Sequence, residues 1–261
     1  MKKSLYRLML ELTHNPLYTV LLKRFSQGKL SRRVIPSFSK AFNINEEEIE
    51  KHVSQFESLS DFFSRKLKEG SREISESARD IVSPVDGVLT EAGKITKDKS
   101  FFVKGHRHSL KTMLGLDTSV KRFAEGDYCV LYLSPKDYHR IHSPCKGKIT
   151  GRWALGKYSH PVNALGFRFG KEPLATNYRL ITELKHDEKH VALVKVGALN
   201  VNSVHPVHVE ESIDKGDDMA YFSFGSTVVL VFERNSVRFH ERVLQGELTV
   251  KQGETIGTWM E

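Results

Sequence analysis

The stretch Thr227-Val228-Val229-Leu230-Val231-Phe232 follows the step Gly225-Ser226 and contains one of the longest apolar runs of the 261-residue chain. β-Branched and aromatic side chains dominate it, which favours a buried β-strand. Similar runs, separated by Gly, Pro and Asp, recur from residue 80 onward. The predicted strands are Gly87–Ala92, Tyr128–Leu133, Gly147–Trp153, Tyr178–Glu183, Val191–Val196, Met219–Phe222, Thr227–Phe232 and Glu247–Val250.

The N-terminal part has a different pattern. From Leu5 to about Phe25 apolar residues recur at helical spacing, with Pro16 as a break or a new helix start. A second helix is expected from about Glu46 to Lys68, because acidic residues open this stretch and basic ones close it. Shorter helices are expected at Ser109–Leu114 and after Ser134-Pro135, where Ser is a good N-cap and Pro suits the first helical position.

Together these patterns predict an α+β fold, with a mainly β catalytic domain behind an N-terminal amphipathic helical region. We place the helical, membrane-associating region at residues 1–70 and the β-rich domain at residues 71–261. The composition, 39% hydrophobic and 28% charged, is that of an ordinary globular chain and excludes collagen, disorder and a disulfide scaffold.

The positive charge is concentrated at one end. Residues 1–40 carry nine basic side chains and one acidic one, which accounts for the whole net charge of +8. This indicates an attachment surface for an anionic phospholipid membrane rather than a nucleic-acid binder. The alternative is that the helices only cap the rest of the protein.

The location of the protein is expected from what the sequence lacks. No apolar run approaches the roughly 18–20 residues that span a bilayer, and no secretory leader is recognisable. Cys129 and Cys145 are too few for a disulfide framework and are expected as reduced thiols. We therefore expect a peripheral protein on the cytoplasmic side of the cell membrane.

Three places carry unusual chemistry. Asp86 lies in SPVDG (residues 83–87), where it is either a reactive carboxylate or an ordinary turn residue. His139 and His142 are expected on one helical turn, where they would share a face and act as base and acid, bind a metal or end a helix. Gly225-Ser226 is the third, and such a step between strands is normally a tight turn.

The context of Gly225-Ser226 favours a reaction there. Gly225 has no side chain to block its carbonyl carbon, and the hydroxyl of Ser226 follows directly. An N-to-O acyl shift, β-elimination and hydrolysis would convert Ser226 into a pyruvoyl group. The serine needs an oriented base, and His142 held by Asp86 would complete a Ser-His-Asp triad. Cleavage would yield a β chain of residues 1–225 and an α chain of residues 226–261.

Five motifs occur in the order DFFSRKL (residues 61–67), SPVDG, FFVKG (101–105), YHRIHSPCKG (138–147) and FGST (224–227). In this order the chain closely resembles phosphatidylserine decarboxylase, in its short bacterial form. The resemblance places the family's aspartate at Asp86, its triad histidine at His142 and its pyruvoyl-forming serine at Ser226. It gives His139 the handling of the substrate proton. The family usually has Leu-Gly before the serine, whereas this chain has Phe224-Gly225.

The resemblance implies a lyase that decarboxylates phosphatidylserine to phosphatidylethanolamine and CO2. Its cofactor would be the covalent pyruvoyl group at Ser226, which forms a Schiff base with the substrate amine, and no metal is expected. A histidine with a pKa near neutrality would then protonate the former α-carbon. The expected partners are the lipid, the membrane surface and the α and β chains of one precursor. Oligomeric state is left open, with a homo-oligomer as one option.

Two rival functions remain at this point. A zinc hydrolase is suggested by close histidine pairs such as His186 and His190, although none forms His-Glu-x-x-His. A biotinyl- or lipoyl-like carrier module is suggested by the β-rich composition and the Pro-x-Asp-Gly turn, although no lysine stands at an obvious hairpin tip.

Overall fold

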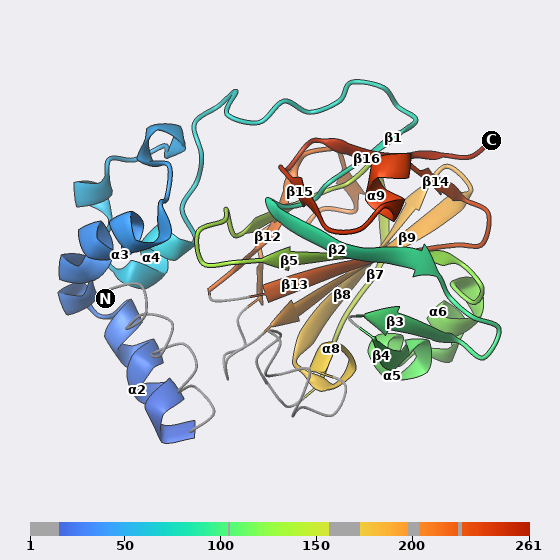
Figure 1. Ribbon diagram of the computed structural model, residues 1–261, viewed down its shortest axis with the longest axis horizontal. Helices are drawn as coiled ribbons and strands as arrows, with labels where there is room; N and C mark the ends of the chain where they lie inside the picture. The colour runs from blue at the N-terminus through green and yellow to red at the C-terminus, as the bar shows by residue number, and fades with distance from the viewer. Residues whose placement is uncertain (1–15, 104, 157–172, 198–203, 224–225) are drawn as a thin grey trace.

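The computed structural model describes residues 16–103, 105–156, 173–197, 204–223 and 226–261 (Figure 1). The first part of the predicted helical pair, Leu5 to Asn15, lies outside the described residues, as does Gly225. Within the described part of the chain, no helix is long and apolar enough to cross a membrane.

Helices from the N-terminal part lie together beside the strands (Figure 1). They are α2 (Pro16–Gln27), the 3-10 helix η2 (Lys29–Val34), α3 (Ile35–Phe42) and α4 (Leu59–Phe63). A separate apolar cluster joins α3 and α4 with the end of η2, and in it Phe62 lies edge-on to Phe56, with ring centroids 5.2 Å apart. The boundary predicted at residue 70 falls between α4 and the first strand, and it stays a prediction.

The single helix predicted from Glu46 to Lys68 is wrong. The segment instead forms the 3-10 turns η3 (Glu46–Glu48) and η4 (Val53–Gln55), followed by α4. Side chains cap each of these pieces, because Asn45, His52 and Ser58 each accept a backbone N–H at the start of one. Each cap begins a new helical turn, so charge at the two ends of the segment does not indicate one continuous helix.

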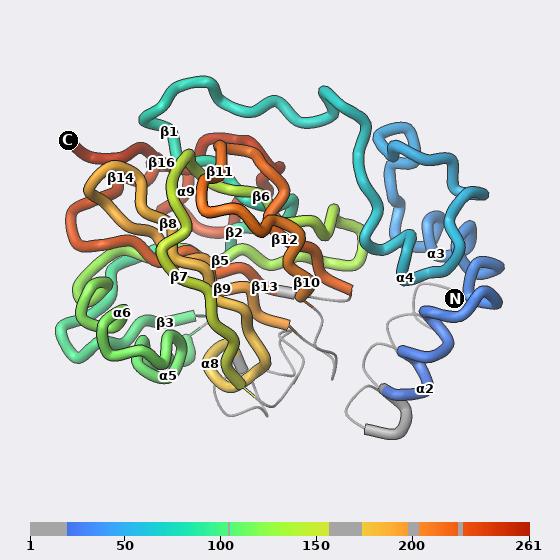
Figure 2. Tube along the Cα trace, turned by 180° about the vertical axis from the view of Figure 1, so that it is seen from behind, coloured from blue at the N-terminus to red at the C-terminus, as the bar shows by residue number. Residues whose placement is uncertain are grey.

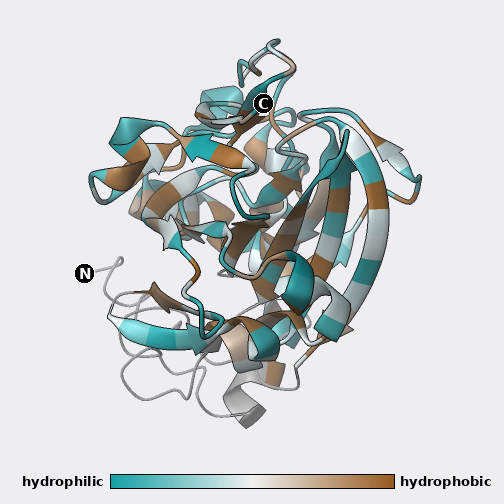
Figure 3. Ribbon diagram, turned by 90° about the vertical axis from the view of Figure 1, so that its right-hand side faces the viewer, coloured by the Kyte–Doolittle hydropathy of each residue, from teal (hydrophilic) through white to brown (hydrophobic). Residues whose placement is uncertain are grey.

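An eight-stranded antiparallel sheet forms the centre of the fold. Its order is β11 (Ser212–Ile213), β7 (Gly147–Leu155), β8 (Arg179–His186), β9 (Lys189–Gly197), β13 (Ser226–Phe232), β5 (Asp127–Leu133), β2 (Gly87–Lys94) and β15 (Leu248–Val250). Apolar clusters cover both faces, with Leu230 in one cluster and Val229 in the other. Figure 3 shows hydrophobic residues, in brown, along the strands of this sheet. Burial on both faces explains why β13 reads as a continuous apolar run.

Smaller sheets complete the fold. One has the order β1 (Asp80–Val82), β16 (Thr255–Trp259), β14 (Val237–Phe239), and another the order β10 (Val204–Pro206), β12 (Asp218–Phe222), β6 (Arg140–His142). β3 (Ser100–Val103) pairs with β4 (His106–Ser109) near the helices α5 (Leu110–Leu114) and α6 (Asp117–Arg122), and α8 (Pro173–Thr176) and α9 (Glu241–Leu244) are single turns. The β10-β12-β6 sheet lies beside the start of β13 in Figures 1 and 2.

The predicted fold class, α+β and mainly β, is confirmed, and each predicted strand corresponds to an observed one. The helix at Ser109–Leu114 is also confirmed, since the Ser109 hydroxyl accepts the N–H of Thr112 at the start of α5. The helix expected after Ser134-Pro135 is wrong. Asp137 accepts both the N–H and the hydroxyl of Ser134, which closes a turn, and the chain then enters strand β6.

Candidate active site

The predicted cleavage step lies where the chain passes from one sheet to another. Phe222 ends β12, and its N–H donates to the carbonyl of His139 at 2.9 Å. Ser226 begins β13 and is the register partner of Leu133 in β5 and of Gly197 in β9. Gly225 and the side chain of Ser226 are outside the described part of the structure. The step therefore joins two strands that are each anchored by their own neighbours.

Asp86 lies in the tight turn between β1 and β2. Gly87 allows this turn to approach β5 closely, because a Cβ at position 87 would lie 2.4 Å from the carbonyl oxygen of Tyr132. The nearly buried carboxylate of Asp86 accepts from Arg72 through Nε at 3.0 Å and through Nη2 at 2.5 Å. The N–H of Gln252 donates to the same carboxylate at 2.9 Å. Asp86 is thus held by a two-pronged ion pair rather than by its own turn.

The triad hypothesis expects Asp86 to orient His142, but the ring of His142 contacts other groups. Its Nδ1 lies 2.8 Å from the carbonyl oxygen of Gly216, and its Nε2 lies 3.1 Å from the Tyr138 hydroxyl. A carbonyl only accepts, so the ring proton is on Nδ1 and Nε2 accepts from Tyr138. The two segments are nevertheless adjacent, because the N–H of His142 donates to the carbonyl of Pro84 at 2.8 Å.

The environment keeps the His142 ring neutral. Burial lowers its pKa below the usual value of 6.5, and the hydrogen bond to Gly216 and the charge of Asp218 offset only part of this effect. Asp86 raises the pKa slightly through its charge. A neutral ring with a lone pair on Nε2 has the protonation state of a general base.

His139 is fully buried immediately before β6. Its ring packs against Phe63 of α4 with centroids 4.0 Å apart, and its Nδ1 lies 2.8 Å from the carbonyl oxygen of Asp137. Its Nε2 has no hydrogen-bond partner among the described residues. Burial, and next the charge of Arg65, lower its pKa to about 3. The expectation of a pKa near neutrality is therefore wrong.

His139 and His142 also do not share a helical turn. His142 belongs to strand β6, which pairs with β12 so that Asp218 is the register partner of His142. Pairing with β12 overrides the local helical reading of the sequence. The two side chains accordingly have separate partners.

Two arginines of this region were not predicted. Arg65 lies within DFFSRKL, and its Nη2 donates to the carbonyls of Lys136 and Asp137 at 3.0 and 2.9 Å. Arg72 donates to Glu48 at 2.9 Å as well as to Asp86. The motif DFFSRKL could have indicated that Arg65 and Phe63 belong to the site. No sequence pattern near Arg72 indicates the partners of Arg72.

The structure does not support the rival hypothesis of a zinc hydrolase. In the described ranges, no group of three or more His, Cys, Asp or Glu is placed to hold a metal ion. Cys129 and Cys145 are both buried free thiols, as expected from their number. Burial raises the pKa of Cys145 to about 12, which leaves it a poor nucleophile.

Comparison with known proteins identifies the family. The sequence model described as phosphatidylserine decarboxylase matches residues 59–258. Curated relatives named "phosphatidylserine decarboxylase proenzyme" from Bacillus cereus and Bacillus mycoides are each 48% identical over 258 residues, covering 99% of this chain and 98% of the relative. A relative of the same name from Bacillus thuringiensis is equally similar.

The chain belongs to the phosphatidylserine decarboxylase family. The resemblance stated from the five motifs is thereby confirmed, as is the prediction of a lyase enzyme. The roles of Asp86, His139, His142 and Ser226 stay predictions.

Proposed function

We propose that this chain cuts itself between Gly225 and Ser226 and then converts phosphatidylserine to phosphatidylethanolamine and CO2. The family and the word "proenzyme" in the names of its relatives support both statements. One structural observation carries the proposal further. The predicted cut joins two separately anchored strands next to His139, whose buried Nε2 has no partner among the described residues.

Self-cleavage needs only groups of this chain and one water molecule. The Ser226 hydroxyl attacks the carbonyl carbon of Gly225, the peptide C–N bond breaks, and an ester forms. Loss of the α-proton of Ser226 expels the carboxylate of Gly225, and hydrolysis of the resulting dehydroalanine releases ammonia. We assign His142 as the base because burial keeps its ring neutral, and Asp86 as the group that fixes the neighbouring turn through Arg72.

A pyruvoyl group formed from Ser226 would supply a ketone for Schiff-base chemistry with the substrate amine and would act as the electron acceptor when CO2 leaves. The chain itself moves the proton. We assign to His139 Nε2 the delivery of a proton to the former α-carbon. A ring with a pKa of about 3 is a weak base and is neutral before the substrate enters, so it can donate only after a proton has been passed to it during the reaction.

The test is intact-mass measurement of the purified protein together with release of CO2 from phosphatidylserine. We expect a β chain of residues 1–225 and a blocked α chain of residues 226–261. Ser226→Ala should leave one uncut, inactive chain, whereas Ser54→Ala, at an exposed serine of the helical region, should be cut and active. A wild-type protein that is fully active at full length rules out the proposal.

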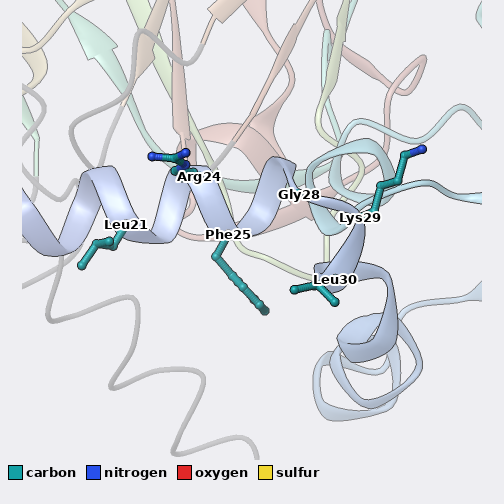
Figure 4. Close-up of a pocket in the computed structure, with 6 residues that line it drawn as sticks. All are labelled: Leu21, Arg24, Phe25, Gly28, Lys29 and Leu30. Atoms are coloured by element: carbon teal, nitrogen blue, oxygen red, sulfur yellow. The ribbon is translucent and has the colours of Figure 1, made fainter.

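We also propose that the helical region binds the cytoplasmic side of the cell membrane as a peripheral contact. Figure 4 shows Leu21, Phe25 and Leu30 projecting from one side of α2 and η2, along a groove that Arg24 and Lys29 also line. The three apolar side chains are 66%, 40% and 68% exposed. Exposed apolar side chains beside basic ones are the pattern of an interfacial helix, which combines insertion with attraction to anionic lipid.

The chemistry of the substrate supports the same location, since phosphatidylserine lies in an anionic leaflet. The remaining expected partners are the α and β chains of one precursor, which would stay associated because β13 is central in the sheet.

A further inference from the structure

The strand that leads into the predicted cut, β12, has a histidine on each side. His139 lies on the β6 side, where its carbonyl oxygen accepts the N–H of Phe222. His205 lies on the β10 side, as the register partner of Tyr221. These contacts secure the backbone of β12 up to its last residue.

The next residue, Ser223, is held by a side-chain contact. Its hydroxyl oxygen lies 2.7 Å from Nε2 of His205, and Ser223 itself is 6% exposed. The His205 ring stacks on Tyr221, with centroids 4.8 Å apart and planes 20° from parallel. Stacking fixes the ring plane, so Nε2 is directed at Ser223 rather than free to rotate.

The predicted reaction takes place within three residues of this contact. Ser223 is fixed by His205, Ser226 is fixed in β13 between β5 and β9, and only Phe224 and Gly225 connect them. Every peptide plane in such a short connection depends on where its two ends are held. Attack by a neighbouring hydroxyl requires the carbonyl carbon at near-contact distance and correct angle, so the anchoring of both ends affects the rate.

We propose that His205 and Ser223 are positioning residues for self-cleavage, which fix the chain at the end of β12, two residues before Gly225. This inference rests on the proposed function, because it concerns the same cut. His205 and Ser223 take no part in proton transfer or bond breaking. Burial, and then Lys23 of α2, lower the pKa of His205, which keeps its ring neutral and suited to a hydrogen bond with an uncharged hydroxyl.

The test compares removal with conservative replacement at both positions. Ser223→Ala and His205→Ala should slow the appearance of the cleaved chains about tenfold, the factor expected from one hydrogen bond of ordinary net strength. Ser223→Thr keeps the hydroxyl and His205→Gln keeps a hydrogen-bonding group, so both should restore most of the rate. A merely structural loss would not follow the presence of the hydrogen bond.

His208→Ala is the matched control. This histidine is on the same segment, is also half-buried and contacts the carbonyl oxygen of Ser212 through Nε2 at 2.9 Å, away from the cut. It should be cleaved at the wild-type rate. Thermal unfolding of each substitution in a Ser226→Ala background, where no variant can cleave, separates slow cleavage from poor folding.

The outcomes distinguish this inference from the proposed function. If the wild type is not cut at residues 225/226, the proposed function fails. If the wild type is cut there and both alanine variants are cut as fast as the wild type, only the positioning role is wrong. Should Ser223→Ala not fold, the pair His205→Ala and His205→Gln decides the question, and equal rates for these two would overturn it.

Discussion

The Arg72 guanidinium donates to both carboxylate oxygens of Asp86, at 3.0 and 2.5 Å. These bonds connect the segment after the helical region to the turn that precedes β2. The pair is well shielded, with the two side chains 8% and 12% exposed. Asp86 contributes to the site by fixing where SPVDG lies, and SPVDG in turn receives the N–H of His142 at Pro84. The turn that holds Asp86 is thus linked to His142 by this backbone hydrogen bond.

The first prediction concerns this pair. Arg72→Met should leave the Asp86 carboxylate with only the Gln252 N–H and should destabilise the protein by about 3–5 kcal/mol, the usual cost of stranding a buried charge. Self-cleavage should slow as well, because the turn loses its tie. Urea unfolding and the rate of chain separation on gels measure the two effects.

Arg79→Met is the control for Arg72→Met. Arg79 pairs with Glu261 at the surface, where the side chains are 68% and 81% exposed. Exposed pairs contribute roughly 0–1 kcal/mol, so this variant should fold and cleave like the wild type. Equal destabilisation by both substitutions would contradict the special role of the buried pair.

The second prediction separates maturation from turnover. Asp86→Ala and His142→Ala should accumulate the uncut precursor, because the first releases the turn and the second removes the base. His139→Ala should still be cut, at least in part, yet release CO2 poorly. Gels and CO2 release on the same preparations measure the two steps, and equal cleavage defects in all three variants would be inconsistent with this division, though not with the family.

The family and the central strands could be predicted from the sequence because both depend on local patterns. β5, β9 and β13 are buried on two faces, so their apolar runs are visible without knowing any partner. The segments of Asp86 and His142 are adjacent, because the N–H of His142 donates to the carbonyl of Pro84, and His139 lies directly before β6.

The partners of these residues could not be predicted because they depend on contacts distant in the sequence. Arg65 reaches carbonyls 71 and 72 residues away, and His142 reaches a carbonyl 74 residues away. β6 is Arg-Ile-His, which has no strand pattern and forms only because β12 pairs with it. The low pKa of His139 likewise follows from its burial under Phe63, which no local spacing reveals.

The third prediction concerns pH and stability. The pKa of His139 is about 3 in the folded protein and near 6.5 when unfolded, so between these values the unfolded chain binds more protons. The stabilisation that comes from the neutral His139 ring is therefore fully present above pH 6.5 and is lost as the pH falls. From pH 6.5 to 5 protonation of this one ring in the unfolded chain should lower the free energy of unfolding by about 2 kcal/mol.

His139→Gln removes the titrating ring, so its urea midpoint should fall less than that of the wild type between pH 6.5 and 5. His52→Gln, at an exposed histidine of the helical region, is the control. Loss of the cap of η4 shifts its urea midpoint at every pH, but the fall between pH 6.5 and 5 should match that of the wild type. Parallel pH profiles for wild type and His139→Gln would show that His139 is not buried in its neutral form.

The fourth prediction tests the membrane contact. Replacing Lys23, Arg24, Arg32 and Arg33 with Gln should remove several kcal/mol of attraction to anionic vesicles, at about 1 kcal/mol for each charge near the surface. Salt should weaken wild-type binding too, because the Debye length is only about 8 Å at physiological ionic strength. Self-cleavage should survive, since the predicted cut lies between β12 and β13, whereas activity on vesicles should fall more than activity on detergent-dispersed lipid.

The same number of Gln replacements at exposed lysines far along the chain, such as Lys97 and Lys99, controls for net charge. Co-sedimentation with vesicles decides between the two readings of the helices: unchanged binding of the four-residue variant means that they only cap the fold, and a loss specific to it means that they are the membrane contact.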